Sequence, residues 1–262
     1  PKAVTTKEML HKGLCIGKSA NDKYPQQRWR VPIAQAADYP KKALPIPAYV
    51  LGAWLGDGTS SSSEITGHFD DVEVIGRCSD LLGGVGDLKF IPGREHLFRC
   101  KFAGVREELA ALGVLNNKHI PESYLTSSTE DRVELLRGLM DTDGTASNDG
   151  KSRVELCFTD ARLAQHCLEL VRSLGEKATF RVDAIQGYVH PRYRIGWTVT
   201  NINPFHLERK AARTPWRPRT KTVSAKTVTG IELVPTVPTR CIRVAHPSHT
   251  FLIGRHYTVT HN

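Results

Sequence analysis

The sequence lacks any long apolar run and any pair of cysteines spaced for zinc. Its apolar stretches fall far short of the roughly 20 residues that cross a bilayer, and its N-terminus has no signal-peptide pattern. The six cysteines are scattered, with no C-x-x-C pair, which excludes a structural zinc site and a small disulfide scaffold. We therefore expect a cytoplasmic, monomeric protein with no membrane partner.

Acidic residues are too few to balance the basic ones, which leaves a net charge of +9 and a pI near 9.3. A surplus of this size is typical of a polyanion-binding protein, although some proteins are merely basic. The cations are concentrated in one stretch that contains a single acid, Glu208, and also Trp216. We expect that stretch to bind the phosphates of double-stranded DNA. Its predicted DNA-binding residues are Arg209, Lys210, Arg213, Arg217, Arg219 and Lys221.

A chain of 262 residues exceeds the usual size of one domain, and its middle contains an internal repeat. Apolar periodicity predicts the same order, α-β-α-β-β-α, in each half. In the first half these elements are residues 49–56, 64–68, 70–82, 88–91, 96–102 and 105–112. In the second half they are residues 134–141, 153–159, 161–174, 178–182, 193–200 and 204–212. Such repeats predict an α+β domain with two small sheets that together form a saddle.

The last segment has a different character. It contains short strand-like runs at 228–234, 241–244, 250–253 and 257–259, separated by proline and glycine turns. A β-rich segment this short needs partner strands, for which we expect residues 1–40. The predicted organisation is therefore a split β domain, residues 1–44 and 216–262, interrupted by an α+β domain at 45–215. The two repeats of that domain span about 45–125 and 126–215.

Two similar stretches, Val50–Gly58 and Leu136–Gly144, lie 86 residues apart (143 minus 57). Each is an apolar helix that ends in an acid and a glycine. A glycine inside a helix costs about 1 kcal/mol relative to alanine, so Gly52 and Gly138 indicate that the two helices approach closely. Gly58 and Gly144 are expected to adopt the positive φ that is common at a helix C-terminus.

Asp57 and Asp143 would then lie side by side. A carboxylate is disfavoured at a helix C-terminus, which carries partial negative charge, but a bound divalent cation removes that conflict. We expect these two acids to bind Mg²⁺ and to be catalytic. The open alternative is an ordinary helix that ends in an Asp-Gly turn. A calcium loop is excluded, because Ala146 occupies the position that such a loop requires to be glycine.

These two stretches resemble the paired motifs of LAGLIDADG homing endonucleases, closely at Leu136–Gly144 and more loosely at Val50–Gly58. The first copy has Leu55 where the motif usually has its first acid, so Asp141 has no counterpart. The run from Asn117 to Glu122 resembles a block that precedes the second motif. By that resemblance Lys118 is a catalytic lysine, whereas its alternative role is a solvated loop residue. The partner lysine of the second half is not located, and Lys221 and Lys226 are weak candidates.

The C-terminal segment resembles the splicing half of an intein, with its all-β Hint horseshoe. The final Asn262 can cyclise and cleave the peptide bond that follows it, helped by His261. Most inteins have Asp where this chain has Cys241. That exchange, with Thr260 before His261, resembles class 3 inteins, in which the cysteine is the first nucleophile. His249 matches a histidine that is catalytic in the later steps of splicing. Splicing is expected to need no cofactor. The alternatives are a buried strand cysteine and a satisfied core histidine.

This resemblance implies a self-splicing intein, of the kind found in bacterial replicative DNA helicases, that carries a site-specific endonuclease. Its partners would be the flanking host protein segments and a duplex DNA target. The N-terminal splicing blocks of the family are not recognisable, so the chain as printed is not expected to splice alone. Two alternatives remain: a DNA-binding protein with this fold that no longer cleaves, and a freestanding homing endonuclease.

Overall fold

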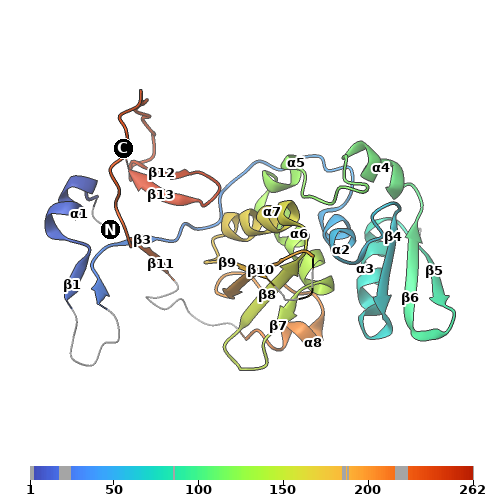
Figure 1. The fold of residues 1–262 in the computed structure, drawn as a ribbon. Coiled ribbons are helices and arrows are strands. Elements are labelled where there is room, and N and C mark those ends of the chain that lie inside the picture. Colours follow the sequence, from blue (N-terminus) through green and yellow to red (C-terminus); the bar gives the residue numbers. More distant parts are fainter. Residues whose placement is uncertain are drawn as a thin grey trace. The chain divides into compact units, whose positions relative to one another are not determined.

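The computed structural model describes residues 3–17, 25–84, 86–184, 187, 189–215 and 224–261 (Figure 1). The chain forms two compact units. One comprises residues 35–218, and the other combines residues 1–34 with 219–262. The larger unit contains nearly all of the buried hydrophobic residues. Among the described residues, no helix is both long and apolar enough to cross a membrane.

The first half of the larger unit begins with helix α2 and builds a three-stranded antiparallel sheet of order β4-β6-β5. Its elements are α2 (Ala48–Asp57), β4 (Glu64–His68), the 3-10 helix η1 (Phe69–Asp71), α3 (Val72–Leu81), β5 (Gly86–Ile91), β6 (Arg94–Phe102) and α4 (Val105–Ala111). The short helix α5 (Glu122–Leu125) leads into the second half. All six predicted elements of this half are present, with boundaries shifted by a few residues.

The second half repeats this plan around a four-stranded antiparallel sheet of order β7-β8-β10-β9. Its elements are α6 (Thr129–Thr142), β7 (Thr145–Ala146), β8 (Arg153–Phe158), α7 (Ala161–Ser173), β9 (Thr179–Asp183), β10 (Arg192–Thr198) and α8 (Glu208–Ala211). The predicted α+β class is confirmed. Strand β7 was not predicted because two residues carry no periodicity; its counterpart in the first half is a single bridge between Gly58 and Ile65.

Helices α2 and α6 pack directly against each other between the two sheets (Figure 1). A Cβ placed on Gly138 would lie 2.2 Å from the Tyr49 carbonyl oxygen, and one on Gly52 would lie 2.2 Å from the Leu135 carbonyl oxygen. Only glycine fits at such distances, because real Cβ atoms do not come that close to a backbone oxygen. The predicted close approach of the two helices is confirmed.

The prediction of positive φ at Gly58 and Gly144 is wrong. Gly58 has a φ of −75°, and Gly144 is also outside the left-handed region. Both are needed for space instead. A Cβ on Gly58 would lie 2.3 Å from the Trp54 carbonyl oxygen, and one on Gly144 would lie 2.5 Å from that of Met140. The chain therefore turns tightly back over each helix end and enters a sheet.

The smaller unit contains α1 (Thr6–Lys12) and the short strands β1 (Cys15–Gly17), β2 (Gln26–Gln27), β3 (Arg30–Pro32), β11 (Ala225–Thr227), β12 (Thr250–Ile253) and β13 (Thr258–His261). Strand β11 pairs with β3, so the C-terminal segment does take a partner strand from the first 40 residues. The strands predicted at 228–234 and 241–244 are wrong, since both runs are irregular. An isolated run with strand propensity does not become a strand without a hydrogen-bonded neighbour.

Candidate active site at the ends of the paired helices

Asp57 and Asp143 occupy equivalent places at the C-terminal ends of the paired helices. Asp57 is the last residue of α2, and the next residue bridges to strand β4. Asp143 is the C-cap of α6, and only Gly144 separates it from β7. Because α2 and α6 are in contact, the two carboxyl groups lie beside each other, each at the inner edge of one sheet.

The electrostatics of the pair reflect this proximity. Restricted access to water, together with the neighbouring charge of Asp143, raises the pKa of Asp57 to about 6. The pKa of Asp143 is also raised, first by burial, while Lys118 and Lys210 act to lower it. Two carboxylates and two ammonium groups thus share one small region.

Lys118 lies at the end of helix α2. Its Nζ atom donates to the carbonyl oxygens of Leu55 and Gly56, each at 3.0 Å, and lies 5.2 Å from the centre of the Trp54 ring. Burial lowers the pKa of this lysine, and the charges of Asp143 and Asp57 oppose that effect. A cation here is favoured by the partial negative charge of the helix end. Lys118 is therefore a partly buried residue beside the acids.

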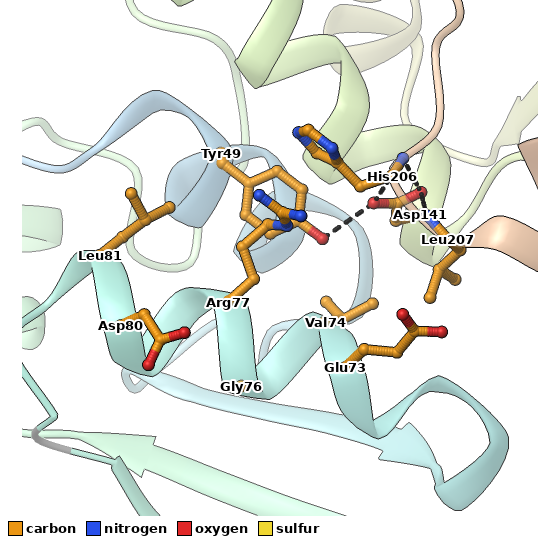
Figure 2. A pocket seen from close by; sticks show the side chains of 10 residues that line it. All are labelled: Tyr49, Glu73, Val74, Gly76, Arg77, Asp80, Leu81, Asp141, His206 and Leu207. Atoms are coloured by element: carbon orange, nitrogen blue, oxygen red, sulfur yellow. Dashed lines mark hydrogen bonds between the residues drawn. The ribbon is translucent and has the colours of Figure 1, made fainter.

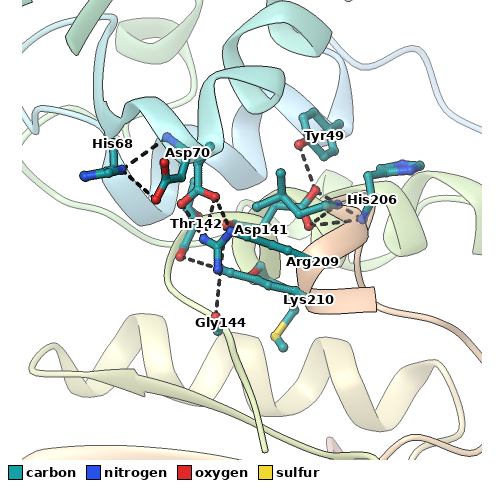
Figure 3. Close-up of polar contacts among 12 residues, drawn as sticks. Tyr49, His68, Asp70, Asp141, Thr142, Gly144, His206, Arg209 and Lys210 are labelled. Atoms are coloured by element: carbon teal, nitrogen blue, oxygen red, sulfur yellow. Dashed lines mark hydrogen bonds and ion pairs between the residues drawn. The ribbon is translucent and has the colours of Figure 1, made fainter. Parts of the chain in front are cut away.

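Lys210 is the counterpart of Lys118 and was missed in that role by the sequence analysis. Its Nζ atom donates to the carbonyl oxygens of Asp141 at 2.7 Å and Thr142 at 3.1 Å, which correspond in the repeat to Leu55 and Gly56 (Figure 3). Two further carbonyls, Met140 and Gly144, also accept from it. Its place in the last helix of the second repeat could have identified it as the partner of Lys118. The sequence analysis instead grouped it with the neighbouring basic residues.

The predicted phosphate-binding stretch is only partly an exposed basic surface. Lys210 was predicted to bind DNA phosphates, but this residue is only 7% exposed. It is buried because its ammonium group caps the C-terminal end of helix α6. Arg209 donates to Asp71 in a two-pronged ion pair that neutralises much of its charge. Arg213 is exposed. Arg217, Arg219 and Lys221 lie outside the described residues. Lys226 donates to the His256 carbonyl within the smaller unit.

The outward faces of both sheets carry cations that the sequence analysis did not select. In strand β6, Phe98, Cys100 and Phe102 are buried, so Arg99 and Lys101 project from the opposite face. Register places residues of the neighbouring strands on the same outward faces. The cations on these two faces are Lys89, Arg99, Lys101, Arg153, Arg181, Arg192 and Arg194. Several form ion pairs there, for example Arg194 with Asp183 at 2.7 Å.

Asp141, the first acid of the second motif, is buried. Its carboxylate accepts hydrogen bonds from the Tyr49 hydroxyl and from the backbone N–H groups of His206 and Leu207 (Figure 2). A cavity of about 490 Å³ lies beside these residues and is also lined by Arg77. The guanidinium carbon of Arg77 lies 5.5 Å from the centre of the Tyr49 ring.

The two carboxylates at the helix ends fit a hard divalent cation. Mg²⁺ prefers oxygen ligands, and proteins commonly hold it with one or two carboxylates, the remaining ligands being water and substrate phosphate. The described residues contain no group of three or more His, Cys, Asp or Glu side chains arranged around one metal position. Asp57 and Asp143 match this sparse coordination. The pKa of Asp57 is raised first by burial and then by the charge of Asp143, and a bound cation would favour the ionised form of both acids.

The residues predicted for self-processing lie in the smaller unit. Cys241 is exposed in an irregular segment. His249 has a positive φ of 50°, and its ring centre lies 6.0 Å from that of His261. Strands β12 and β13 bring these two histidines together, because Thr250 pairs with His261 and Phe251 pairs with Thr260. Asn262 lies outside the described residues.

Comparisons with known proteins agree with this picture of the larger unit. Residues 130–204 match the family described as a LAGLIDADG-like domain. A replicative DNA helicase DnaB from Mycobacterium intracellulare is 36% identical over 235 residues, which are 87% of this chain. The chain spans only 37% of the length of that relative.

Two solved structures with similar folds are a homing endonuclease and a LAGLIDADG domain of another protein. One is I-DmoI in complex with DNA and Ca, at 14% identity and a TM-score of 0.45, covering 63% of this chain and 94% of that one. Another is the N-terminal LAGLIDADG domain of DUF199/WhiA, at 11% identity and a TM-score of 0.37, covering 58% of this chain and 78% of that one.

Proposed function

Since the chain contains a LAGLIDADG-like domain, we propose that residues 45–215 are a site-specific, Mg²⁺-dependent endonuclease for double-stranded DNA. The observation that carries this proposal is the pairing of Asp57 and Asp143 at two adjacent helix ends, each accompanied by its own lysine. A pseudo-two-fold arrangement of acids and lysines suits a substrate whose two strands are themselves related by two-fold symmetry.

DNA binding is assigned to the outward faces of the two sheets together with Arg213. Just after each acid the chain pairs with a strand of its sheet, Gly58 with Ile65 and Thr145 with Glu155, so a duplex lying along the faces would bring its backbone to Asp57 and Asp143. Cations such as Arg99 and Arg181 would neutralise phosphates and release counterions. Acids such as Asp183 hold some of these cations in fixed positions. Fixed cations orient the protein on the DNA backbone, in addition to attracting it electrostatically.

The chemistry follows from the positions of these groups. Asp57 and Asp143 would hold the metal against a scissile phosphate, and Mg²⁺ bound there supplies charge stabilisation and lowers the pKa of water. Lys118 and Lys210 place positive charge beside the same phosphates, where negative charge develops during hydrolysis. Burial lowers the pKa of both lysines, which makes proton exchange with water easier than for an exposed lysine.

The nuclease is tested with a supercoiled plasmid that contains the joined host sequence without the intervening insert. The full chain should linearise this plasmid with Mg²⁺ and should not do so with EDTA. Asp57→Asn and Asp143→Asn should each slow cleavage roughly 100-fold or more, because each removes a metal-binding charge. Asp38→Asn, an exposed acid before α2, is the matched control and should cleave normally. Specific binding of the plasmid without cleavage would instead identify a DNA-binding protein that has lost catalysis.

The smaller unit is proposed to be part of a Hint-type domain that performs protein splicing. The exposed Cys241 thiol would attack the upstream junction, the acyl group would pass to the first downstream host residue, and Asn262 would cyclise with the help of His261. Support comes from the neighbouring His249 and His261 rings, which place two proton carriers beside the terminal strand. The similarity to a replicative DNA helicase supports such a helicase as host.

Splicing is tested in a precursor that contains the whole insertion and both flanking host segments. Cys241→Ala should prevent the branched intermediate and the ligated product, both visible by gel electrophoresis and mass spectrometry. Cys15→Ala, which removes another exposed cysteine of the same unit, is the control and should splice normally. Splicing of Cys241→Ala at the normal rate would refute the class 3 assignment. A precursor that cuts DNA but never splices would favour a freestanding endonuclease.

A further inference from the structure

Asp141 breaks the symmetry between the two repeats. At the equivalent position of the first repeat the buried side chain is Leu55, which cannot accept a hydrogen bond. The Asp141 carboxylate, by contrast, accepts from the Tyr49 hydroxyl at 2.9 Å and from the N–H groups of His206 and Leu207 at 3.1 Å each. We call these four residues the Asp141 cluster. A carboxylate buried with three donors is held firmly in one orientation.

The Asp141 cluster is connected directly to Lys210. His206 and Leu207 immediately precede α8, the short helix that carries Lys210. The backbone carbonyl of Asp141 is itself the nearest acceptor of the lysine, at 2.7 Å. The Asp141 side chain thus binds the segment that precedes Lys210, and the Asp141 backbone carbonyl binds the Lys210 ammonium group itself.

The outer side of the Asp141 cluster is formed by His206. Its Nε2 atom lies 2.9 Å from the Glu134 carboxylate, and its ring meets the edge of Tyr49 with ring centres 5.5 Å apart. The cavity beside Tyr49 and His206 leaves room around the tyrosine ring (Figure 2). Removal of the Tyr49 hydroxyl therefore loosens Asp141 without forcing the surrounding side chains to repack.

Lys118 is held by different groups. Within the part of the chain that the structure describes, its contacts are the carbonyls of Leu55 and Gly56 and the face of Trp54. The Trp54 indole is fixed in turn by its hydrogen bond to the Ser62 carbonyl at 2.8 Å. None of these groups belongs to the Asp141 cluster, so the two lysines are positioned by separate structural means.

We propose that Asp141 is a positioning residue that acts through the 206–207 segment on Lys210, and that it controls cleavage of one DNA strand while the Lys118 site cleaves the other strand independently. This inference rests on the proposed nuclease function. It assigns to Tyr49 a strand-specific role, since the Tyr49 hydroxyl is the one side-chain donor to Asp141 in the Asp141 cluster.

The experiment measures the cleavage rate of each strand separately, with a duplex target labelled at one 5′ end or the other. Lys118→Met and Lys210→Met first establish which strand depends on which lysine. Tyr49→Phe should then slow the Lys210-dependent strand roughly tenfold, the effect of one lost hydrogen bond to a charged group, and leave the other strand unchanged. Tyr124→Phe removes another buried hydroxyl, bonded to Ile46, and should keep the normal ratio of strand rates. Equal slowing of both strands by Tyr49→Phe would overturn the proposal.

A second measurement does not depend on nuclease activity. Lys210 should resist acylation by a water-soluble ester in the native chain, because its ammonium group is enclosed. Tyr49→Phe should raise the acylation rate of Lys210, read by mass spectrometry, without raising that of Lys118; Tyr124→Phe should change neither. An unchanged acylation rate of Lys210 in Tyr49→Phe would refute the positioning role, whether or not the native chain cleaves DNA. Failure of the native chain to cleave DNA would count only against the proposed nuclease.

Discussion

Replacement of Gly138 by alanine should destabilise the larger unit by about 3 kcal/mol, at the upper end of the range for overpacked cores. The added methyl group would meet the Tyr49 carbonyl oxygen at 2.2 Å and the Ala53 nitrogen at 2.6 Å. Both are backbone atoms of α2, so no side chain can rotate away, and the two helices must separate. The melting temperature of the full chain should fall by roughly 6–12 °C, measured by circular dichroism or calorimetry.

Gly76 provides the matched control for this substitution. It lies inside helix α3, and a Cβ there would meet no heavy atom within 4 Å. Gly76→Ala should therefore be neutral or stabilise the protein by up to about 1 kcal/mol, through the better helix propensity of alanine. A Gly138→Ala variant that melts at the same temperature as the native chain would show that α2 and α6 are not in close contact. The same variant should lose DNA cleavage, because the helix separation sets the spacing of the two acids.

The second large effect is expected at Arg132, which is fully buried in the first turns of α6. Its guanidinium group donates to the carbonyl oxygens of Ser127, Ser173 and Ala37 and to the Ser173 hydroxyl. Arg132→Met keeps most of the volume but leaves those buried acceptors without their donor. We expect a loss of about 3–5 kcal/mol in the free energy of unfolding, measured by urea titration.

Arg132 also joins the segment before α2 to the core, since Ala37 belongs to that segment. The Arg132→Met variant should therefore be cut by proteases between residues 35 and 47 faster than the native chain. Arg106→Met, on the exposed face of α4, is the control and should change stability by less than about 0.5 kcal/mol. If Arg132→Met proved as stable as Arg106→Met, the buried hydrogen bonds would contribute no net stability.

The acids of the candidate site were identified from the sequence because two local patterns coincide. An apolar helix interrupted by glycine and followed by Asp-Gly occurs twice, and each copy has a physical reason for its glycines. The helical segments and most strands of the larger unit were predicted for a similar reason, since amphipathic periodicity is a property of short segments. Lys118 was located by its resemblance to a family block, and the structure places it at the end of α2.

Other features could not be obtained in this way. Lys210 reads as one of several exposed cations, and only the return of α8 to the end of α6 turns its side chain inward. Arg132 reads as a surface residue in a charged helical turn. The predicted strands at 228–234 and 241–244 have the right composition but lack a neighbouring strand in the described residues, so they remain irregular.

The sequence by itself determined which residues form the paired helices, which glycines they need at their contact, and which two acids end them. These are consequences of local periodicity and of the space that a side chain requires. Only the tertiary structure decided that Gly58 and Gly144 are needed for space, with φ outside the left-handed region. It also decided that Asp141 faces Tyr49 and the 206–207 segment, and that Lys210 occupies in the second repeat the position that Lys118 occupies in the first. Those outcomes depend on contacts between segments far apart in the chain, and such contacts leave no periodic trace in the sequence.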